Sequence, residues 1–276
     1  MKTIQLQTQD DLTLHGTIYA PMDPKALVVL IHGMGEHFGR YGHVAEFFTQ
    51  NGYAFAGMDL RGHGRSQGKR GHTPSYEYLM NDIELLISTI QVDFPELPLF
   101  IYGHSMGGNL VLNALIRRSL PITAAVISAP YLKLAFEPPK WKTVLGKISA
   151  KWLPELTQPT GLDTEALSRD PNVILAYNND PLVHDKITSS FFVNVHFAGP
   201  YVLEHAAKIN IPLLLMHGTK DQLTSHWATQ ELNEKIPERS ELKLWEGFYH
   251  ELHNEPGQKE LLHFVLNWLK MRSVEY

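Results

Sequence analysis

The residue type and spacing best suited to chemistry lie around Ser105, the middle residue of the sequence GHSMG at positions 103–107. The pattern G-x-S-x-G is typical of a sharp turn between a strand and a helix that exposes a serine hydroxyl. Glycines are needed there because a side chain would meet the neighbouring backbone. Such a pattern also occurs by chance in loops, but an apolar segment at 99–102 and a helical pattern at 109–116 flank this one. The context therefore favours a nucleophile.

A serine nucleophile needs a base and an acid that orients the base. After a turn of this kind, the acid and then the base are expected to follow the serine along the chain. Asp221 follows an apolar segment and a glycine turn, which predicts a carboxylate in the loop after a late strand. The alternative role for Asp221 is to cap the next helix. Glu137 and Asp163 are alternative acids, and they fit less well because they fall in an irregular segment.

The candidate bases are the histidines that follow the acid, namely His226, His250, His253 and His263. His250 lies in the loop directly after the last predicted strand, where an imidazole can reach the serine. His253, in the same loop, is the rival candidate. The other two begin or lie within predicted helices, so we expect them at the surface or in packing contacts. His250 is the predicted base.

An oxyanion hole is expected from two backbone N–H groups. One belongs to Met106, which directly follows the serine at the start of the predicted helix, where N–H groups lack partners. The second is expected from Met34, in the loop after the first buried strand. The sequence thus predicts hydrolysis through an acyl-enzyme, with Ser105, Asp221 and His250 as nucleophile, acid and base. This chemistry requires no metal or organic cofactor.

Composition places the chain among ordinary globular proteins. Its 276 residues are 43% hydrophobic and 19% charged, enough for one large α/β domain with an insertion. A net charge of −5 gives no reason to expect nucleic acid as a partner, and the lack of cysteine excludes disulfides and thiolate chemistry. No apolar leader or run of roughly 18 apolar residues is present. We therefore expect a cytoplasmic protein.

Strand and helix patterns alternate along most of the chain. Residues 4–20 predict an antiparallel hairpin at a sheet edge. Further strands are predicted at 26–31, 53–58, 99–102, 124–128, 211–216 and 241–245, and helices at 44–51, 76–92, 109–116, 225–235 and 258–271. This alternation implies a mostly parallel sheet with helices on both faces. The alternation of strand and helix patterns stops at 131–205. This segment is predicted to be a helical cap inserted between late strands, with 1–130 and 206–276 forming the core.

Taken together, these motifs resemble the α/β-hydrolase superfamily, and specifically its monoacylglycerol lipase and lysophospholipase branch. The resemblance rests on HGMGEHFGRY at 32–41, DLRGHGRS at 59–66, GHSMGG at 103–108, YNNDPL at 177–182 and YHELH at 249–253. It covers nearly the whole chain, and the first and last motifs are more specific than the serine turn, which many hydrolases share.

The resemblance implies the α/β-hydrolase fold and hydrolysis of monoacylglycerols or related lysolipids to fatty acid and glycerol. It also implies that Glu36, Arg40, Tyr177 and His253 line the part of the site that holds the glycerol head. The residues alone leave an equal alternative for Glu36 and Arg40, a salt bridge that shapes the loop. Alternative functions are a broad carboxylesterase or thioesterase, an aminopeptidase with the same triad, and, more distantly, a non-catalytic receptor.

The predicted cap contains one apolar helical stripe, formed by Trp141, Val144, Leu145, Ile148, Trp152 and Leu153. The favoured interpretation is that this stripe packs on the core and walls an acyl channel. The alternative is that part of it faces outward and makes transient contact with the inner membrane surface, through which a lipid ester substrate would enter.

Overall fold

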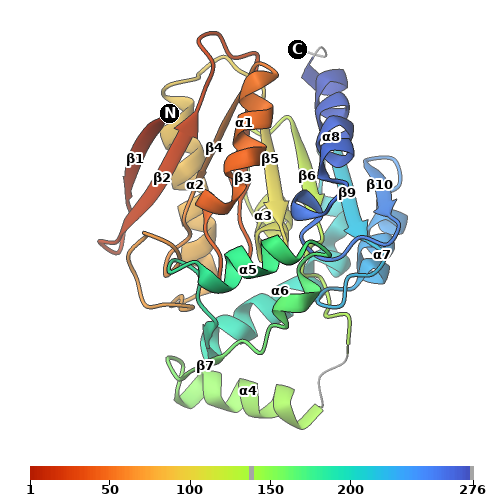
Figure 1. Ribbon diagram of the computed structural model, residues 1–276. Helices are drawn as coiled ribbons and strands as arrows, with labels where there is room; N and C mark the ends of the chain where they lie inside the picture. Colours follow the sequence, from red (N-terminus) through yellow and green to blue (C-terminus); the bar gives the residue numbers. More distant parts are fainter. Residues whose placement is uncertain (137–139, 274–276) are drawn as a thin grey trace.

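One sheet lies at the centre of the molecule (Figure 1). The computed structural model describes residues 1–136 and 140–273, with the backbone only for 140–144. In this described part the sheet has eight strands, in chain order β1 (Lys2–Gln7), β2 (Thr13–Tyr19), β3 (Ala26–Ile31), β4 (Tyr53–Met58), β5 (Leu99–His104), β6 (Ala124–Ser128), β9 (Leu213–Gly218) and β10 (Ser240–Trp245). Their spatial order is β1-β2-β4-β3-β5-β6-β9-β10. All neighbouring pairs from β4 to β10 are parallel.

The hairpin at the sheet edge confirms the prediction for residues 4–20. Strands β1 and β2 pair antiparallel, and Asp11 in the turn between them has a φ of 63°. Side chains of β2 alternate between buried and half-buried, whereas every residue of β3 is buried. This difference follows from position, because β3 lies between parallel neighbours and is covered on both faces.

Helices cover both faces of the sheet, as the alternating pattern predicted. They are α1 (Gly42–Gln50), α2 (Tyr76–Gln91), α3 (Met106–Arg117), α7 (His226–Lys235) and α8 (Gln258–Ser273). Leu27, Val29 and Ile31 share a hydrophobic cluster with α2, α3 and α7, while Val28 and Leu30 share the opposite one with α1 and α8. The period-two alternation of β3 therefore places apolar side chains in two separate cores.

The chain between β6 and β9 forms further helices at one end of the sheet (Figure 1). These are α4 (Lys140–Trp152), α5 (Pro171–Asn179) and α6 (Ser189–His205), with the short paired strands β7 (Thr157–Pro159) and β8 (Lys186–Thr188). The backbone N–H of His184 donates to the carbonyl of Gly35, so the segment contacts the loop after β3. Phe191, Val195 and Val202 of α6 are buried in the same cluster as α3. This end of the sheet is where Ser105 and the loop after β3 lie.

Helix α4 forms where the apolar stripe predicted a helix, but the favoured interpretation of that stripe is wrong for the side chains that the structure describes. Trp152 is 73% exposed, and Leu145, Ile148 and Leu153 are each more than half exposed. The reason is that α4 packs on α6 through other positions, since Ser149 Oγ lies 2.7 Å from Ser189 Oγ. The side chains of Trp141 and Val144 lie outside the described part. Across the described helices, none combines the length and apolar character required to cross a bilayer.

Candidate active site

Ser105 occupies the strained turn that the sequence predicted. It directly follows β5 and precedes α3, with φ 54° and ψ −117°, a backbone conformation that residues with a side chain rarely adopt. The glycines make the turn possible. A Cβ on Gly103 would lie 2.7 Å from the carbonyl oxygen of Gly107, and a Cβ on Gly107 would lie 2.0 Å from that of Ile31. Because Gly103 and Gly107 have no side chain, α3 can start close to β3, and the chain can turn sharply at Ser105 at the end of the sheet.

Three loops bring Ser105, His250 and Asp221 together. The Ser105 hydroxyl donates to Nε2 of His250 across 2.9 Å, and Nδ1 of His250 donates to Oδ2 of Asp221 across 2.7 Å. The proton positions are assigned from these partners, because the carboxylate can only accept. His250 and Asp221 are buried, and Ser105 is half-buried. This geometry is that of a nucleophile, a base and an orienting acid.

The acid is held by the loop in which it lies. Oδ1 of Asp221 accepts hydrogen bonds from the backbone N–H groups of Leu223 and Thr224. The alternative of a helix cap is wrong, because the side chain of Ser225 caps α7 instead. Asp163, a rejected candidate acid, accepts a hydrogen bond from the next short turn rather than approaching the serine. Glu137 lies outside the described residues.

Burial and charge act against each other on the triad. Burial alone would raise the pKa of Asp221, but the opposing charge and hydrogen bonds of His250 and His217 hold it well below its usual range. Burial would lower the pKa of His250, yet the Asp221 carboxylate outweighs burial and raises it. Burial, together with the charge of His250, lowers the pKa of the adjacent His104 to about 4. Of the two adjacent rings, His250 is therefore the better proton acceptor and His104 stays neutral.

The loop after β3 lies against the nucleophile. A Cβ on Gly33 would lie 3.3 Å from the Cβ of Ser105, so the backbone of Gly33, the residue before Met34, is next to the serine. Met106 is the first residue of α3, and its side chain is fully buried. Oε1 of Glu36 accepts the backbone N–H of Gly33 at 2.7 Å and fixes the loop. The two expected oxyanion donors therefore come from backbone segments that flank Ser105.

A buried charge network joins two of the residues expected at the glycerol head. Arg40 donates to Glu36 at 2.7 Å and forms a two-pronged pair with Glu251 at 2.6 and 2.7 Å. The guanidinium also lies 4.7 Å from the ring centre of Tyr177 in α5. Glu251 was not among the residues predicted from the sequence, although its place directly after the base was a signal that could have found it. The loop-shaping alternative for Glu36 and Arg40 matches these contacts.

His253, the rival base, is fully buried and makes no hydrogen bond to the serine among the described residues. Its ring stacks on Tyr41 with centres 4.4 Å apart and meets the edge of His104 at 4.9 Å. Both ring nitrogens lack a protein partner within the described part. Burial, with nearby positive groups, lowers its pKa well below the usual value. His253 is thus a neutral ring next to the triad, with free hydrogen-bonding atoms.

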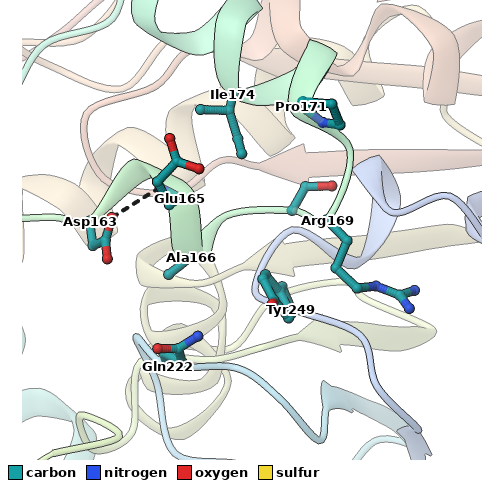
Figure 2. A pocket seen from close by; sticks show the side chains of 9 residues that line it. Asp163, Glu165, Ala166, Arg169, Pro171, Ile174, Gln222 and Tyr249 are labelled. Carbon is teal, nitrogen blue, oxygen red and sulfur yellow. Dashed lines mark hydrogen bonds between the residues drawn. The ribbon is translucent and has the colours of Figure 1, made fainter.

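A pocket of about 500 Å³ is lined in part by sequence neighbours of the acid and the base, and Ser105 is not among its lining residues. Asp163, Arg169 and Ile174 line it from the segment before and within α5. Gln222 and Tyr249, neighbours in sequence of the acid and the base, line it from the core (Figure 2). The pocket therefore follows the border between the inserted helices and the sheet.

An eight-stranded sheet with this order, carrying a serine, a histidine and an acid on the loops at one end, defines an α/β-hydrolase. Residues 22–257 match the family described as serine aminopeptidase, S33, and the chain belongs to this family. It is 36% identical over 249 residues to a monoacylglycerol lipase of Mycolicibacterium smegmatis, covering 90% of this chain and 89% of that protein.

Two further similarities extend this result. The chain is 36% identical over 271 residues to an uncharacterized abhydrolase domain-containing protein of Dictyostelium discoideum, covering 97% of this chain and 29% of that longer protein. The crystal structure of the Paleococcus ferrophilus monoacylglycerol lipase superimposes with a TM-score of 0.86 at 33% identity, covering 94% of this chain and 99% of that one. The fold and the order of its elements are therefore shared over nearly the whole chain.

Proposed function

We propose that this chain is a serine hydrolase that cleaves monoacylglycerols or related lysolipids into fatty acid and glycerol. One observation carries the proposal, the placement of the His250 ring between Ser105 and Asp221 at hydrogen-bond distance on both sides. The similarity to monoacylglycerol lipases over nearly the full chain supports the substrate class.

In the proposed reaction, His250 takes the Ser105 proton as the hydroxyl attacks the ester carbonyl. Asp221 keeps the imidazole in the useful tautomer and stabilises its charged form. The backbone N–H groups of Met34 and Met106 bind the oxyanion that forms. The imidazolium then protonates the departing alcohol, and water attacks the acyl-enzyme with His250 again as the base. The imidazolium returns the proton taken from water to the Ser105 oxygen as the acyl–serine bond breaks and the fatty acid leaves, so water is the only co-reactant.

The glycerol head is proposed to lie near Tyr177 and His253. His253 has two buried ring nitrogens without a protein partner in the described part, and such atoms require a partner from water or ligand. The Tyr177 hydroxyl would lie 3.4 Å from a Cβ on Gly35, which places it over the loop next to the nucleophile. Glu36 and Arg40 are proposed to act by holding that loop.

The family description raises an aminopeptidase as the alternative. An aminopeptidase binds a substrate with a free ammonium group, and an unpaired carboxylate near the nucleophile would favour that substrate. Glu36 accepts hydrogen bonds from Gly33, Tyr41 and Arg40, and Glu251 is paired with Arg40. Because Glu36 and Glu251 are already paired within the protein, the lipid ester is the better candidate.

A substrate panel and one variant test this function. Purified protein is assayed with 1- and 2-monoacylglycerols of several chain lengths, lysophosphatidylcholine, triacylglycerol and an aminoacyl amide, and labelled with a fluorophosphonate probe. We expect preference for monoacylglycerols and labelling that Ser105→Ala abolishes while the circular dichroism spectrum is unchanged. Preference for the amide would replace the lipid assignment, and a folded wild-type protein that resists the probe would exclude a serine hydrolase.

The segment 131–205 is proposed to act as a cap that makes transient contact with the inner membrane surface. Leu145, Ile148 and Trp152 expose apolar area on α4, and Leu153 does so directly after it. Lys147 and Lys151 lie on the same helix. Apolar and basic side chains together favour binding to an anionic lipid surface. The test is flotation with anionic vesicles, where Trp152→Ser is expected to reduce binding. If wild type and variant both remained in the unbound fraction at the bottom of the gradient, the proposed membrane contact would be contradicted.

A further inference from the structure

The buried guanidinium of Arg40 connects two loops that the reaction uses. One is the oxyanion loop, residues 32–37, and the other is the base loop, residues 246–255. Nη1 of Arg40 donates to Glu36 in the first loop and, with Nη2, to Glu251 in the second. Glu251 is adjacent in sequence to the base. A single side chain thus bridges the segments that carry the second oxyanion donor and His250.

Each carboxylate is also joined to the backbone or side chains of its own loop. Glu36 accepts the N–H of Gly33, the residue before Met34. Oε2 of Glu251 accepts a hydrogen bond from the Asn254 side chain at 2.7 Å. Movement of the guanidinium would therefore be transmitted to both loops through short hydrogen bonds.

The network is buried and charged throughout. Side-chain exposure is 9% for Arg40 and 3% for each of Glu36 and Glu251. Burial alone would raise the pKa of Glu251, but the charge and hydrogen bonds of Arg40 hold it below its usual value. Two-pronged pairing fixes orientation as well as distance, which a lysine cannot reproduce. Nη1 donates to both carboxylates and Nη2 to Glu251, so these donors are engaged before any substrate arrives.

We propose that Arg40 and Glu251 are positioning residues that clamp the oxyanion loop to the base loop, so that Met34 and His250 are held in register at Ser105. This inference rests on the proposed function, because it concerns the triad and the oxyanion donors. It differs from a glycerol-binding role in one consequence. A clamp affects every ester equally, whereas a head-group ligand affects only substrates that carry the head.

The experiment compares two substrates with the same acyl group and different leaving groups, monobutyrin and p-nitrophenyl butyrate. The variants are Arg40→Lys, which keeps the charge but loses the fork, and Glu251→Gln, which keeps the shape but loses the charge. The matched control is Arg118→Lys, because Arg118 also pairs with two glutamates, Glu77 and Glu84, far from the triad. The rate of fluorophosphonate labelling is measured for every protein, with urea unfolding to verify folding.

We expect Arg40→Lys to lower kcat/KM by about tenfold to a hundredfold on both esters, by the same factor, and to slow labelling in parallel. Glu251→Gln is expected to act in the same direction, and the double variant to lose less than the product of the two single losses. The control should match wild type. A loss restricted to monobutyrin, or no loss on either ester, would overturn the clamp. A wild-type protein that does not react with the probe would instead overturn the proposed function itself.

Discussion

Nε2 of His217 lies 3.0 Å from Oδ2 of Asp221, the same oxygen that accepts the hydrogen bond of His250. His217 is fully buried, and its Nδ1 lies 2.8 Å from the hydroxyl of Thr229 in α7. Nε2 also faces the carbonyl oxygen of Thr224 at 3.2 Å, so this nitrogen carries the proton. Asp221, the proposed acid, therefore has a second histidine as a hydrogen-bond partner.

Replacing this second histidine should change both rate and pH dependence. His217→Leu removes a donor to Asp221, which leaves the carboxylate more basic and raises the pKa of His250 further. We expect kcat/KM to fall by about tenfold and its acidic limb to move to higher pH. His217→Gln, which retains an N–H donor, should show a smaller fall in kcat/KM and a smaller shift of the acidic limb than His217→Leu. A pH–rate profile of each variant checks this, and a Leu variant with the wild-type profile would contradict it.

The pH dependence of the wild-type protein follows from His250. Its pKa is raised above the ordinary 6.5, because the Asp221 carboxylate outweighs the effect of burial. Since only the neutral ring can accept the Ser105 proton, activity should fall as pH drops through a midpoint above 6.5. Asp221→Asn should move the midpoint to lower pH and reduce kcat by about 10⁴-fold. A wild-type midpoint well below 6.5 would argue against His250 as the base.

The turn at the nucleophile should not tolerate a methyl group at Gly107. An added Cβ would lie 2.0 Å from the backbone oxygen of Ile31, which is part of the rigid central sheet. We expect Gly107→Ala to lower the free energy of unfolding by about 1–3 kcal/mol and to abolish activity. Gly42→Ala is the control, because a Cβ there meets nothing within 4 Å at the start of α1. It should be neutral or stabilise by about 0.4–1 kcal/mol in urea unfolding.

The buried ion pair between Arg61 and Asp82 should contribute more to the free energy of unfolding than an exposed ion pair does. Arg61 donates to both oxygens of Asp82 at 2.6 and 2.7 Å, and both side chains are 2% exposed. Arg61→Met leaves an unpaired buried carboxylate, so unfolding free energy should fall by about 3–5 kcal/mol. Lys2→Met, which breaks the exposed pair with Asp93, should cost about 0–1 kcal/mol. Similar losses for the two variants in urea unfolding would contradict this assignment.

Much of the fold was predictable because its determinants are local. Apolar runs such as 26–31 and the glycines around Ser105 define strands and a turn within a few residues. The order of acid and base after late strands then selected Asp221 and His250, and the structure places both at hydrogen-bond distance in the expected chain of contacts. Helix α4 was predicted by the same kind of periodicity, but periodicity does not reveal which face has a neighbour.

The chain by itself thus determined the strands, the nucleophile turn and the three polar side chains suited to ester cleavage. Only the tertiary structure decided what surrounds them. His217 became a support for the acid, Glu251 a partner of Arg40 some 211 positions away, and the α4 stripe an exposed surface. These outcomes depend on how loops from distant strands meet, since burial and pairing arise between segments and leave no spacing along the sequence.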